Sequence, residues 1–240
     1  MLNENSNMDK TYIFPNGIKL KKDEVKRTLA GELTMQKFIS GYDIASRKSI
    51  INHLIEKNNF KSYLEIGVYE GQNFKNINVK FKVGVDPKPL TTNANVLKLT
   101  SDQFFEKNKL KFDIIFIDGL HLEYQVDKDI KNSLNFINEN GIIVMHDCNP
   151  PSKFHQRENY EVDGEFPSWN GTAWKSFAKL RMNDANLSMF CVDCDWGVGI
   201  IKKGKQKLYK KVRKLSYDLL SNNRKELINL ISVSDFLNKF

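Results

Sequence analysis

The sequence predicts an α/β fold built on a doubly wound, mostly parallel sheet. Three short apolar runs, residues 63–66, 112–117 and 141–145, have the length and continuous hydrophobicity of strands buried on both faces. Between the last two runs, apolar residues recur at helical spacing over residues 123–138, and Asn140 and Gly141 are expected to close this helix. Strands that alternate with helices in this way form parallel sheets. At 240 residues, the chain has room for one such domain with extensions.

Helices are expected before the first strand. Residues 23–39 place apolar side chains at roughly helical spacing, and residues 43–57 form a second segment of this type. Together with the polar start of the chain, they make up an N-terminal helical extension over residues 1–60. Packing against the sheet, a lid over a site and a dimer surface all remain open for this extension.

The first strand ends in a glycine turn with the spacing Glu65-x-Gly67-x-Tyr69-x-Gly71. A strand that ends at a glycine and feeds a helix leaves unpaired N–H groups at the sheet edge, where a cofactor can lie. The spacing differs from the Gly-x-Gly-x-x-Gly turn that holds a pyrophosphate. The carboxylate of Glu65 would repel a pyrophosphate, but it suits a ligand that carries an ammonium group.

Two later junctions bring polar groups to the same edge. Asp86 ends a second strand over residues 81–86, where an acidic side chain can accept hydrogen bonds from ribose hydroxyls. A strand-ending aspartate without such a role is the alternative. After a short third strand over residues 95–99, Ser101 and Asp102 have the composition of a helix cap.

Two central strands each end in an Asp/His pair. The strand over residues 112–118 leads into Asp118 and His121, and the strand over residues 141–147 ends with His146 and Asp147. The carboxyl ends of neighbouring parallel strands meet at the edge where open α/β sheets bind ligands. We therefore expect these four side chains to lie together, and we regard them as the strongest chemical signal in the sequence.

A long irregular segment, residues 151–169, follows at the same edge and is a candidate substrate lid. A helix is expected to start near Thr172 and run to about residue 182. Its N–H groups, with Arg157 or Lys175, could hold an anionic group, although ordinary capping explains this helix start as well. The residues considered for substrate contact are His155, Arg157, Tyr160, Trp169 and Lys175.

The C-terminal part combines a strand pair with a basic tail. Residues 189–192 and 196–201 are expected to form a closing antiparallel pair, and residues 204–240 a basic amphipathic helical tail. Eight of the 37 basic residues lie within residues 202–214, and the other basic residues equal the 29 acidic residues in number. A basic cleft for nucleic acid is therefore not indicated. Contact of the tail with an anionic membrane, a second subunit or solvent remains open.

Composition limits the setting of the protein. The three cysteines, Cys148, Cys191 and Cys194, give no disulfide scaffold and no paired zinc motif. No apolar run approaches the ~18 residues of a membrane span, and the first ten residues lack the apolar region of a signal peptide. We therefore expect a cytoplasmic protein.

With these motifs placed, residues 61–203 resemble the class I S-adenosylmethionine-dependent methyltransferases. They are most similar to bacterial small-molecule and sugar O-methyltransferases, including the macrolide-sugar enzymes and the related cephalosporin-hydroxylase group. The resemblance implies a Rossmann-like, seven-stranded sheet with S-adenosylmethionine as cofactor. It places the cofactor against Glu65, Gly67, Tyr69, Gly71, Asp86 and Asp118, with the adenine near Ser101 and Asp102.

The resemblance also implies roles for the Asp/His residues. In the macrolide-sugar enzymes, the aspartate that matches Asp118 binds a divalent metal, usually magnesium, and the histidine that matches His121 is the base. The second metal pair of those enzymes is Glu-Asp, whereas this chain has His146 and Asp147. Imidazole is a softer ligand than magnesium prefers, so the need for a metal and its identity stay open.

These features predict O-methylation of a sugar, a phosphorylated sugar or another small polar metabolite, in surface-glycan or secondary metabolism. Methyl transfer requires alignment of donor and acceptor and removal of the acceptor's proton. His121 is the predicted base, while Asp118, His146 and Asp147 orient the acceptor directly or through a metal. A metal-dependent hydroxylase, a NAD-binding oxidoreductase and a non-enzymatic membrane adaptor are the alternatives.

Overall fold

The computed structural model describes residues 11–13, 19–21 and 46–240. The predicted helix over residues 23–39 and the start of the one over residues 43–57 lie outside these residues. The second helix is confirmed from Arg47 onward as α3 (Arg47–Asn58), which begins at an N-cap formed by Ser46. Strands β1 (Thr11–Ile13) and β2 (Lys19–Lys21) pair with each other in antiparallel fashion.

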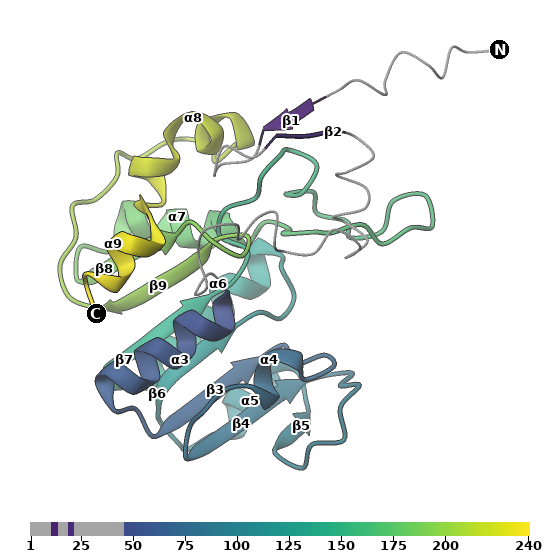
Figure 1. Cartoon of the computed structure of the whole chain (residues 1–240), viewed down its shortest axis with the longest axis vertical. Helices are drawn as coiled ribbons and strands as arrows, with labels where there is room; N and C mark the ends of the chain where they lie inside the picture. Colours follow the sequence, from purple (N-terminus) through teal and green to yellow (C-terminus); the bar gives the residue numbers. More distant parts are fainter. Residues whose placement is uncertain (1–10, 14–18, 22–45) are drawn as a thin grey trace.

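A central sheet of eight strands organises the fold (Figure 1). Its order is β10-β8-β9-β7-β6-β3-β4-β5, and β9 runs antiparallel to both of its neighbours while the other pairs are parallel. The strands are β3 (Ser62–Ile66), β4 (Phe81–Asp86), β5 (Val96–Lys98), β6 (Phe112–Ile117), β7 (Ile137–Met145), β8 (Leu187–Val192), β9 (Val198–Lys203) and β10 (Leu230–Ile231). From β3 the chain adds β4 and β5 on one side of the sheet, and it then returns to add β6 and β7 on the other side of β3. The boundary between β3 and β6 is therefore the switch point where α/β sheets bind ligands.

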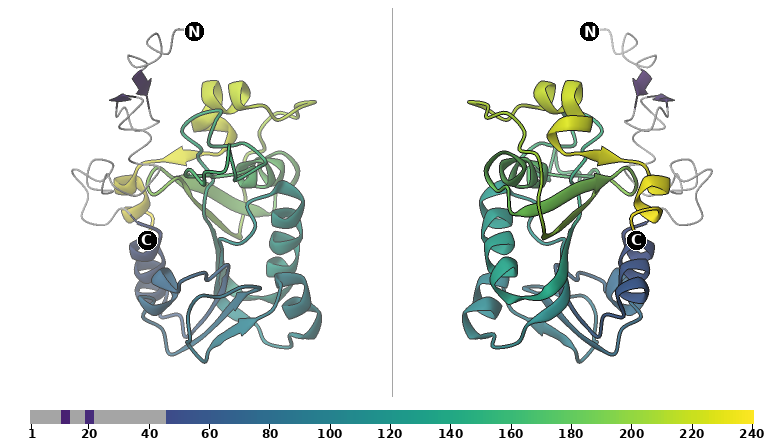
Figure 2. Two further views of the ribbon diagram at one scale, coloured as in Figure 1. Left: turned by 90° about the vertical axis from the view of Figure 1, so that its right-hand side faces the viewer. Right: turned by 90° about the vertical axis from the view of Figure 1, so that its left-hand side faces the viewer.

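Helices cover both faces of the sheet, as predicted for a doubly wound fold. One apolar cluster joins one face to helices α5 to α8, and a second joins the other face to α3, α4 and α9. Figure 2 shows the sheet between α3 and α6, which lie on opposite sides. The helices after α3 are α4 (Gln72–Lys75), α5 (Ser101–Lys107), α6 (Glu123–Phe136), α7 (Ala173–Asn183), α8 (Tyr217–Leu227) and α9 (Val233–Leu237).

Two helix boundaries differ from the interpretation of the sequence. Ser101 and Asp102 lie inside α5, because Thr100 caps the helix and forms a capping box with Gln103. Residues 137–140, which we expected to end α6, belong to β7. A Cβ atom on Gly141 would lie 2.8 Å from the carbonyl oxygen of Asp113. This glycine therefore serves the close approach of β6 and β7 and does not cap the helix.

The C-terminal tail is part of the core rather than a single basic helix. Residues 204–216 contain no helix or strand, and the backbone of Tyr209 is tied to Arg181 by an N–H to carbonyl bond of 2.9 Å. From α8 onward the tail is helical, and its β10 pairs with β8 as an eighth strand where we expected seven. This addition follows from apolar side chains of the tail that become buried against the sheet: Leu220, Leu227, Ile228, Val233 and Phe236.

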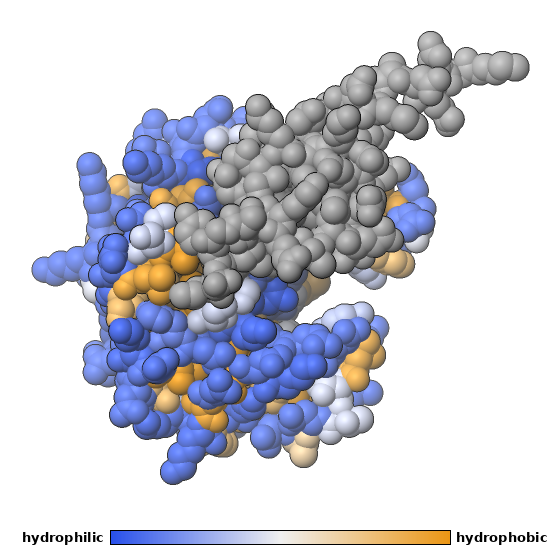
Figure 3. All heavy atoms as spheres, viewed as in Figure 1, coloured by the Kyte–Doolittle hydropathy of each residue, from blue (hydrophilic) through white to orange (hydrophobic). Residues whose placement is uncertain are grey.

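The surface agrees with this burial of apolar side chains. On the face shown in Figure 3, hydrophilic residues surround small apolar areas. Among the described residues, no helix has both the length and the hydrophobicity that a membrane span requires.

Replacing Phe236 by alanine should lower the free energy of unfolding by ~3–5 kcal/mol, because removal of a buried phenylalanine leaves a cavity. Phe236 has no exposed surface and packs 5.5 Å from the ring of His53 on α3. Urea unfolding followed by circular dichroism measures the change. Leu90→Ala, at a position that is 64% exposed, is the control and should change the free energy by less than ~0.5 kcal/mol. Equal, small changes in the free energy of unfolding for the two variants would contradict the burial of Phe236 in a core that α9 shares with α3 and the sheet.

Candidate active site

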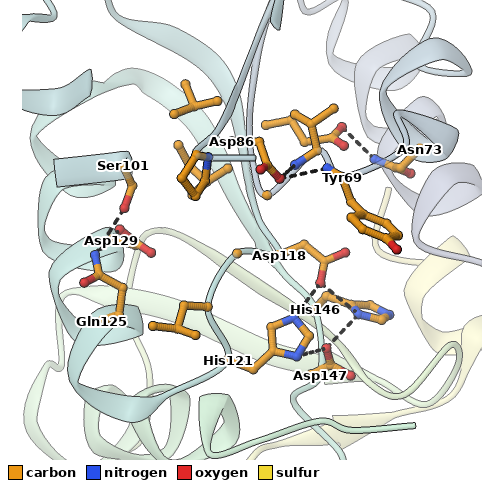
Figure 4. Close-up of a pocket in the computed structure, with 18 of the residues that line it drawn as sticks. Tyr69, Asn73, Asp86, Ser101, Asp118, His121, Gln125, Asp129, His146 and Asp147 are labelled. Atoms are coloured by element: carbon orange, nitrogen blue, oxygen red, sulfur yellow. Dashed lines mark hydrogen bonds and ion pairs between the residues drawn. The ribbon is translucent and has the colours of Figure 1, made fainter. Parts of the chain in front are cut away.

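A pocket of about 980 Å³ opens at the carboxyl ends of β3, β4, β6 and β7 (Figure 4). It lies at the switch point of the sheet, as the sequence predicts. Of the residues predicted to bind a cofactor, a metal or the reacting groups, those that line it are Glu65, Gly67, Tyr69, Asp86, Ser101, Asp102, Asp118, His121, His146 and Asp147. Gly71, which was also predicted to bind the cofactor, does not line the pocket; it is the N-cap residue of α4 and has a φ of 76°.

The glycine turn is shaped by one contact and one side chain. Gly67 has a φ of +87°, and a Cβ atom there would lie 2.1 Å from the carbonyl oxygen of Asp118, so only glycine fits. The carboxylate of Asp86 accepts hydrogen bonds from the backbone N–H groups of Val68 at 3.0 Å, Tyr69 at 2.8 Å and Lys88 at 2.7 Å. Asp86 therefore fixes the turn, and its contact with a ribose stays a prediction.

Glu65 is a buried carboxyl group at one end of the pocket. Its Oε2 accepts hydrogen bonds from the hydroxyl of Tyr63 at 2.5 Å and from Nδ2 of Asn73 at 2.9 Å. Burial raises the pKa of Glu65 to about 7. A cationic group bound beside it would favour the ionised form, which is the behaviour expected for an ammonium site.

Polar groups at the opposite end of the pocket centre on Gln125. Its Nε2 donates to Ser101 Oγ, Asp102 Oδ1 and Asp129 Oδ1, each at 3.1 Å. Asp129 is buried, and this raises its pKa to about 6. The interpretation of the sequence missed Gln125 and Asp129, although two polar residues four apart beside the apolar face of α6 were a usable signal.

The four Asp/His residues converge as predicted, and together they form what we call the Asp/His cluster. Asp118 Oδ1 lies 3.3 Å from His121 Nε2 and 3.2 Å from His146 Nδ1. Asp147 Oδ2 lies 3.1 Å from His121 Nδ1 and 3.1 Å from His146 Nδ1. The parallel pairing of β6 with β7 causes this meeting, because Ile117 and Met145 are register partners at the strand ends.

Charges in the cluster stabilise one another. Burial opposes a positive charge on His121, but the carboxylates of Asp147 and Asp118 raise its pKa above the ordinary value. The pKa of His146 is raised in the same way against burial, chiefly by Asp147. Burial alone would raise the pKa of Asp118, but His146 and Arg47 hold it well below its usual range. The imidazoles thus act as counter-charges to the buried carboxylates.

Two further charged residues, Arg47 and Asp195, complete the site and were missed in the sequence. Arg47 Nη1 lies 3.0 Å from His146 Nε2 and 3.3 Å from Asp195 Oδ1, and Arg47 Nε lies 3.6 Å from Asp118 Oδ2. His146 Nε2 also lies 3.4 Å from Asp195 Oδ1. No sequence signal joins these residues, because Arg47 begins α3 whereas Asp195 lies in the turn between β8 and β9.

The donor atoms of the cluster suit a divalent cation. Asp118, His121 and Asp147 each place one ligand atom within 4.8 Å of the others. Two carboxylates with an imidazole fit a transition-metal ion such as Mn²⁺ or Fe²⁺ better than Mg²⁺, which prefers oxygen ligands. The sequence predicted His146 as the imidazole ligand in place of His121. His146 Nδ1 also lies 3.1–3.2 Å from both carboxylates, while its Nε2 faces Arg47 and Asp195, so a metal contact of His146 stays a prediction.

Aromatic rings of the 151–169 segment lead from the cluster to solvent. The ring of Trp169 stacks on His121 with 5.1 Å between centroids, Tyr160 lies 5.8 Å from Trp169, and Phe166 stacks on Tyr160 at 5.4 Å. We call these four rings the aromatic ladder. Tyr160 and Trp169 line the pocket, and Tyr160 and Phe166 are more than half exposed.

The other three residues considered for substrate contact do not line the pocket. The guanidinium of Arg157 donates to four carbonyl groups of its own segment, those of Phe154, Tyr160, Pro167 and Ser168. His155 is buried with Nδ1 2.8 Å from Ser152 Oγ, and Lys175 lies 3.8 Å from Glu123. In this conformation Arg157 holds the segment in shape.

Comparison with known proteins agrees with the fold described above. Residues 71–148 match a methyltransferase domain family. An S-adenosylhomocysteine-bound methyltransferase from Podospora anserina is 17% identical, with a TM-score of 0.51 over 76% of this chain and 87% of that chain. The cofactor-bound protein Rv0187 from MTB is 13% identical, with a TM-score of 0.50 over 77% of this chain and 96% of that one. The chain has a class I methyltransferase fold.

The methyltransferase fold confirms the predicted resemblance and the Rossmann-like fold class. At these identities the solved structures establish the fold alone, and no curated protein matches significantly. The matched residues 71–148 span α4 to the exit of β7 and therefore include Asp86, Asp118, His121 and Asp147. Assignments of acceptor and chemistry thus depend on the geometry of the site.

Binding of S-adenosylhomocysteine should strengthen as pH rises from about 5.5 to 7.5. Below its pKa of about 7, Glu65 is neutral and cannot pair with the ligand's ammonium group. Affinity should gain roughly tenfold per pH unit below that value and then level off, because ionisation of one group is linked to binding. The charged or titratable groups around Glu65 are Tyr63, Asp118, Arg47 and Lys82.

Isothermal titration calorimetry across this range tests the expectation. Glu65→Gln should bind weakly and without the pH dependence. Asp129→Asn removes the other pocket carboxyl with a raised pKa and should keep the inflection near pH 7. An unchanged pH profile in Glu65→Gln would assign the dependence to another group.

Proposed function

We propose that this protein is an S-adenosylmethionine-dependent O-methyltransferase that acts on a hydroxyl group of a small polar acceptor. The observation that carries the proposal is the position of His121. Its ring lies between the carboxylates of Asp118 and Asp147, lines the pocket beside the glycine turn, and stacks on Trp169. A base held by two carboxylates between a cofactor turn and an aromatic surface is what methyl transfer to a hydroxyl requires.

S-adenosylmethionine, when bound, supplies an electrophilic methyl group on a sulfonium. The chain's own residues align the acceptor and take its proton. Both ring nitrogens of His121 face a carboxylate in this conformation, Nε2 toward Asp118 at 3.3 Å and Nδ1 toward Asp147 at 3.1 Å. Proton transfer therefore requires the acceptor's hydroxyl to replace one carboxylate at its nitrogen, while the other nitrogen donates its hydrogen to the second carboxylate. Asp118 and Asp147 stabilise the imidazolium that results, as the raised pKa of His121 against its burial indicates.

The aromatic ladder supports an acceptor with a flat face. Tyr160 and Phe166, both more than half exposed, stack on each other and continue the row of rings that starts at His121, with Tyr160 tilted by 46° to Trp169. A sugar ring presents an apolar C–H face to such rings and hydroxyl groups at its rim, where Asn170 and Ser168 line the pocket. The cationic groups of Arg157 and Lys175 are paired within the protein, which favours a neutral sugar over a phosphorylated one.

A divalent cation held by Asp118, His121 and Asp147 would occupy the lone pair of His121, and it would then supply Lewis-acid polarisation of the acceptor oxygen in place of that base. The same donor set favours a second candidate function, a metal-dependent hydroxylase on this fold. Ferrous iron binding with oxygen-dependent turnover, in the absence of methyl transfer, would support that candidate instead.

The proposed cellular location and partners are based on the acceptor and on the composition of the chain. A small-molecule acceptor and three free cysteines suit a reducing, cytoplasmic compartment. The lysines and arginine of residues 202–214 remain a candidate surface for peripheral membrane contact, and a homodimer remains a candidate assembly.

His121→Ala should lower kcat by roughly 10²–10⁴-fold, because it removes the proposed base. The dissociation constant of S-adenosylhomocysteine should stay within about twofold of wild type. The measurement is transfer of labelled methyl groups to a panel of sugars and nucleotide-activated sugars. His53→Gln changes a histidine of α3 outside the pocket and should leave kcat unchanged. Near-normal turnover in His121→Ala would refute the assignment.

Trp169→Ala should raise KM for the acceptor about tenfold while cofactor affinity is kept, since the ring forms the first step of the ladder. Trp169 Nε1 also donates to the Arg157 carbonyl at 2.5 Å, and alanine removes this hydrogen bond together with the ring. Trp169→Phe keeps a stacking ring without that bond. Recovery of KM in Trp169→Phe supports stacking, whereas equal losses in both variants would assign the effect to the segment's shape.

A further inference from the structure

The amino-acid end of the proposed cofactor is a zwitterion, and a site for it needs charges of both signs. Glu65 offers a negative charge for the ammonium group. A carboxylate requires a cationic partner with N–H donors, and an arginine fork matches a carboxylate best. The question is which cationic side chain lies at the Glu65 end of the pocket.

The cationic side chains that line the pocket within the described residues are Arg47 and Lys88, besides the two imidazoles. Lys88 follows the end of β4, four residues beyond Gly84, which is the register partner of Glu65, and its backbone N–H donates to Asp86. The imidazoles of His121 and His146 are held between Asp118 and Asp147. Arg47 is the remaining group.

Arg47 and Glu65 both line the pocket, and Asp118 links them. Arg47 Nε lies 3.6 Å from Asp118 Oδ2, and the backbone N–H of Asp118 donates to the carbonyl of Ile66, the residue after Glu65, at 2.8 Å. Burial raises the pKa of Glu65, and Arg47 is among the groups that oppose this rise. Burial alone would lower the pKa of Arg47. Nearby carboxylates instead raise it above its ordinary value, and these are Asp118, Asp195, Asp147 and Glu65. A positive and a negative charge therefore face the same end of the pocket, which is the pattern that an α-amino acid requires.

The guanidinium of Arg47 is also held in place before any ligand binds. The backbone N–H of Arg47 donates to Asp195 Oδ2 at 2.7 Å, and Nη1 lies 3.3 Å from Asp195 Oδ1. These contacts and the one to Asp118 engage Nη1 and Nε, whereas arginine has five N–H donors. The side chain is 33% exposed and lines the pocket, so a ligand can reach it.

We propose that Arg47 binds the carboxylate of the cofactor's amino-acid end, opposite Glu65, which binds its ammonium group. This inference depends on the proposed function, and it assigns a cofactor contact to a residue outside the matched domain of residues 71–148. Asp195 and Asp118 position the guanidinium for this contact. Helix α3 therefore takes part in the cofactor site through its first residue.

A comparison of three ligands isolates the carboxylate contact. Isothermal titration calorimetry gives dissociation constants for S-adenosylhomocysteine, for its decarboxylated analogue, and for 5′-methylthioadenosine, which lacks the whole amino-acid end. Arg47→Gln should weaken S-adenosylhomocysteine about 10- to 100-fold, the range for a hydrogen bond between charged groups. The other two ligands should change by less than about threefold. Lys48→Gln, the same charge change at the next, exposed residue of α3, is the control and should alter none of them.

The outcomes separate this inference from the proposed function. Wild type that binds none of the ligands overturns both. Wild type that binds S-adenosylhomocysteine no better than its decarboxylated analogue overturns the Arg47 contact alone, whether or not any variant folds. Equal weakening of all three ligands in a folded Arg47→Gln variant overturns it too, because a general distortion then explains the loss. Arg47→Lys keeps the charge and should recover part of the preference for the carboxylate.

Discussion

Three carboxylates that meet at one sheet edge are the constraint on which the site depends. Asp118, Asp147 and Asp195 have side chains between 3% and 15% exposed. An unpaired buried charge costs several kcal/mol, so each must have a counter-charge. Two imidazoles and the guanidinium of Arg47 supply it at 3.1–3.6 Å. Because these groups come from α3, β6, β7 and the β8–β9 turn, the site and the packing of those elements stabilise each other.

The two halves of the pocket are built by different means. The half around Gly67 is mainly backbone, and Asp86 fixes it with three N–H bonds, so few side-chain rotamers must be ordered when a ligand binds. The half beyond His121 is a long segment with little regular structure, which Arg157 holds by bonds to its own carbonyls. Such a division suits a constant cofactor beside a variable acceptor, since changes in the segment leave the glycine turn intact.

The sequence alone predicted those features of the fold and the site that local sequence patterns determine. Buried strands have continuous apolar runs, so their ends, and with them Asp118 and Asp147, could be placed on one edge. Arg47 and Asp195 could not be found, because their meeting across 148 positions depends on how α3 packs and on the path of the β8–β9 turn. Gly141 was assigned to a helix end because glycine is common there, whereas close strand packing was the cause. The tail's burial likewise arises from tertiary contacts and not from its spacing.

The imidazole of His146 changes the chemistry that the edge can support. In the macrolide-sugar enzymes that the sequence resembles, a glutamate stands at this position, so the edge there carries one more negative charge. Here His146 is neutral or positive, and Arg47 adds a fixed positive charge, with its Nη1 3.0 Å from His146 Nε2. A divalent cation at Asp118 and Asp147 therefore gains less from the local field than in an all-carboxylate site. The chain's own cations already neutralise the edge, which favours the proposed proton transfer by His121 over chemistry on a metal.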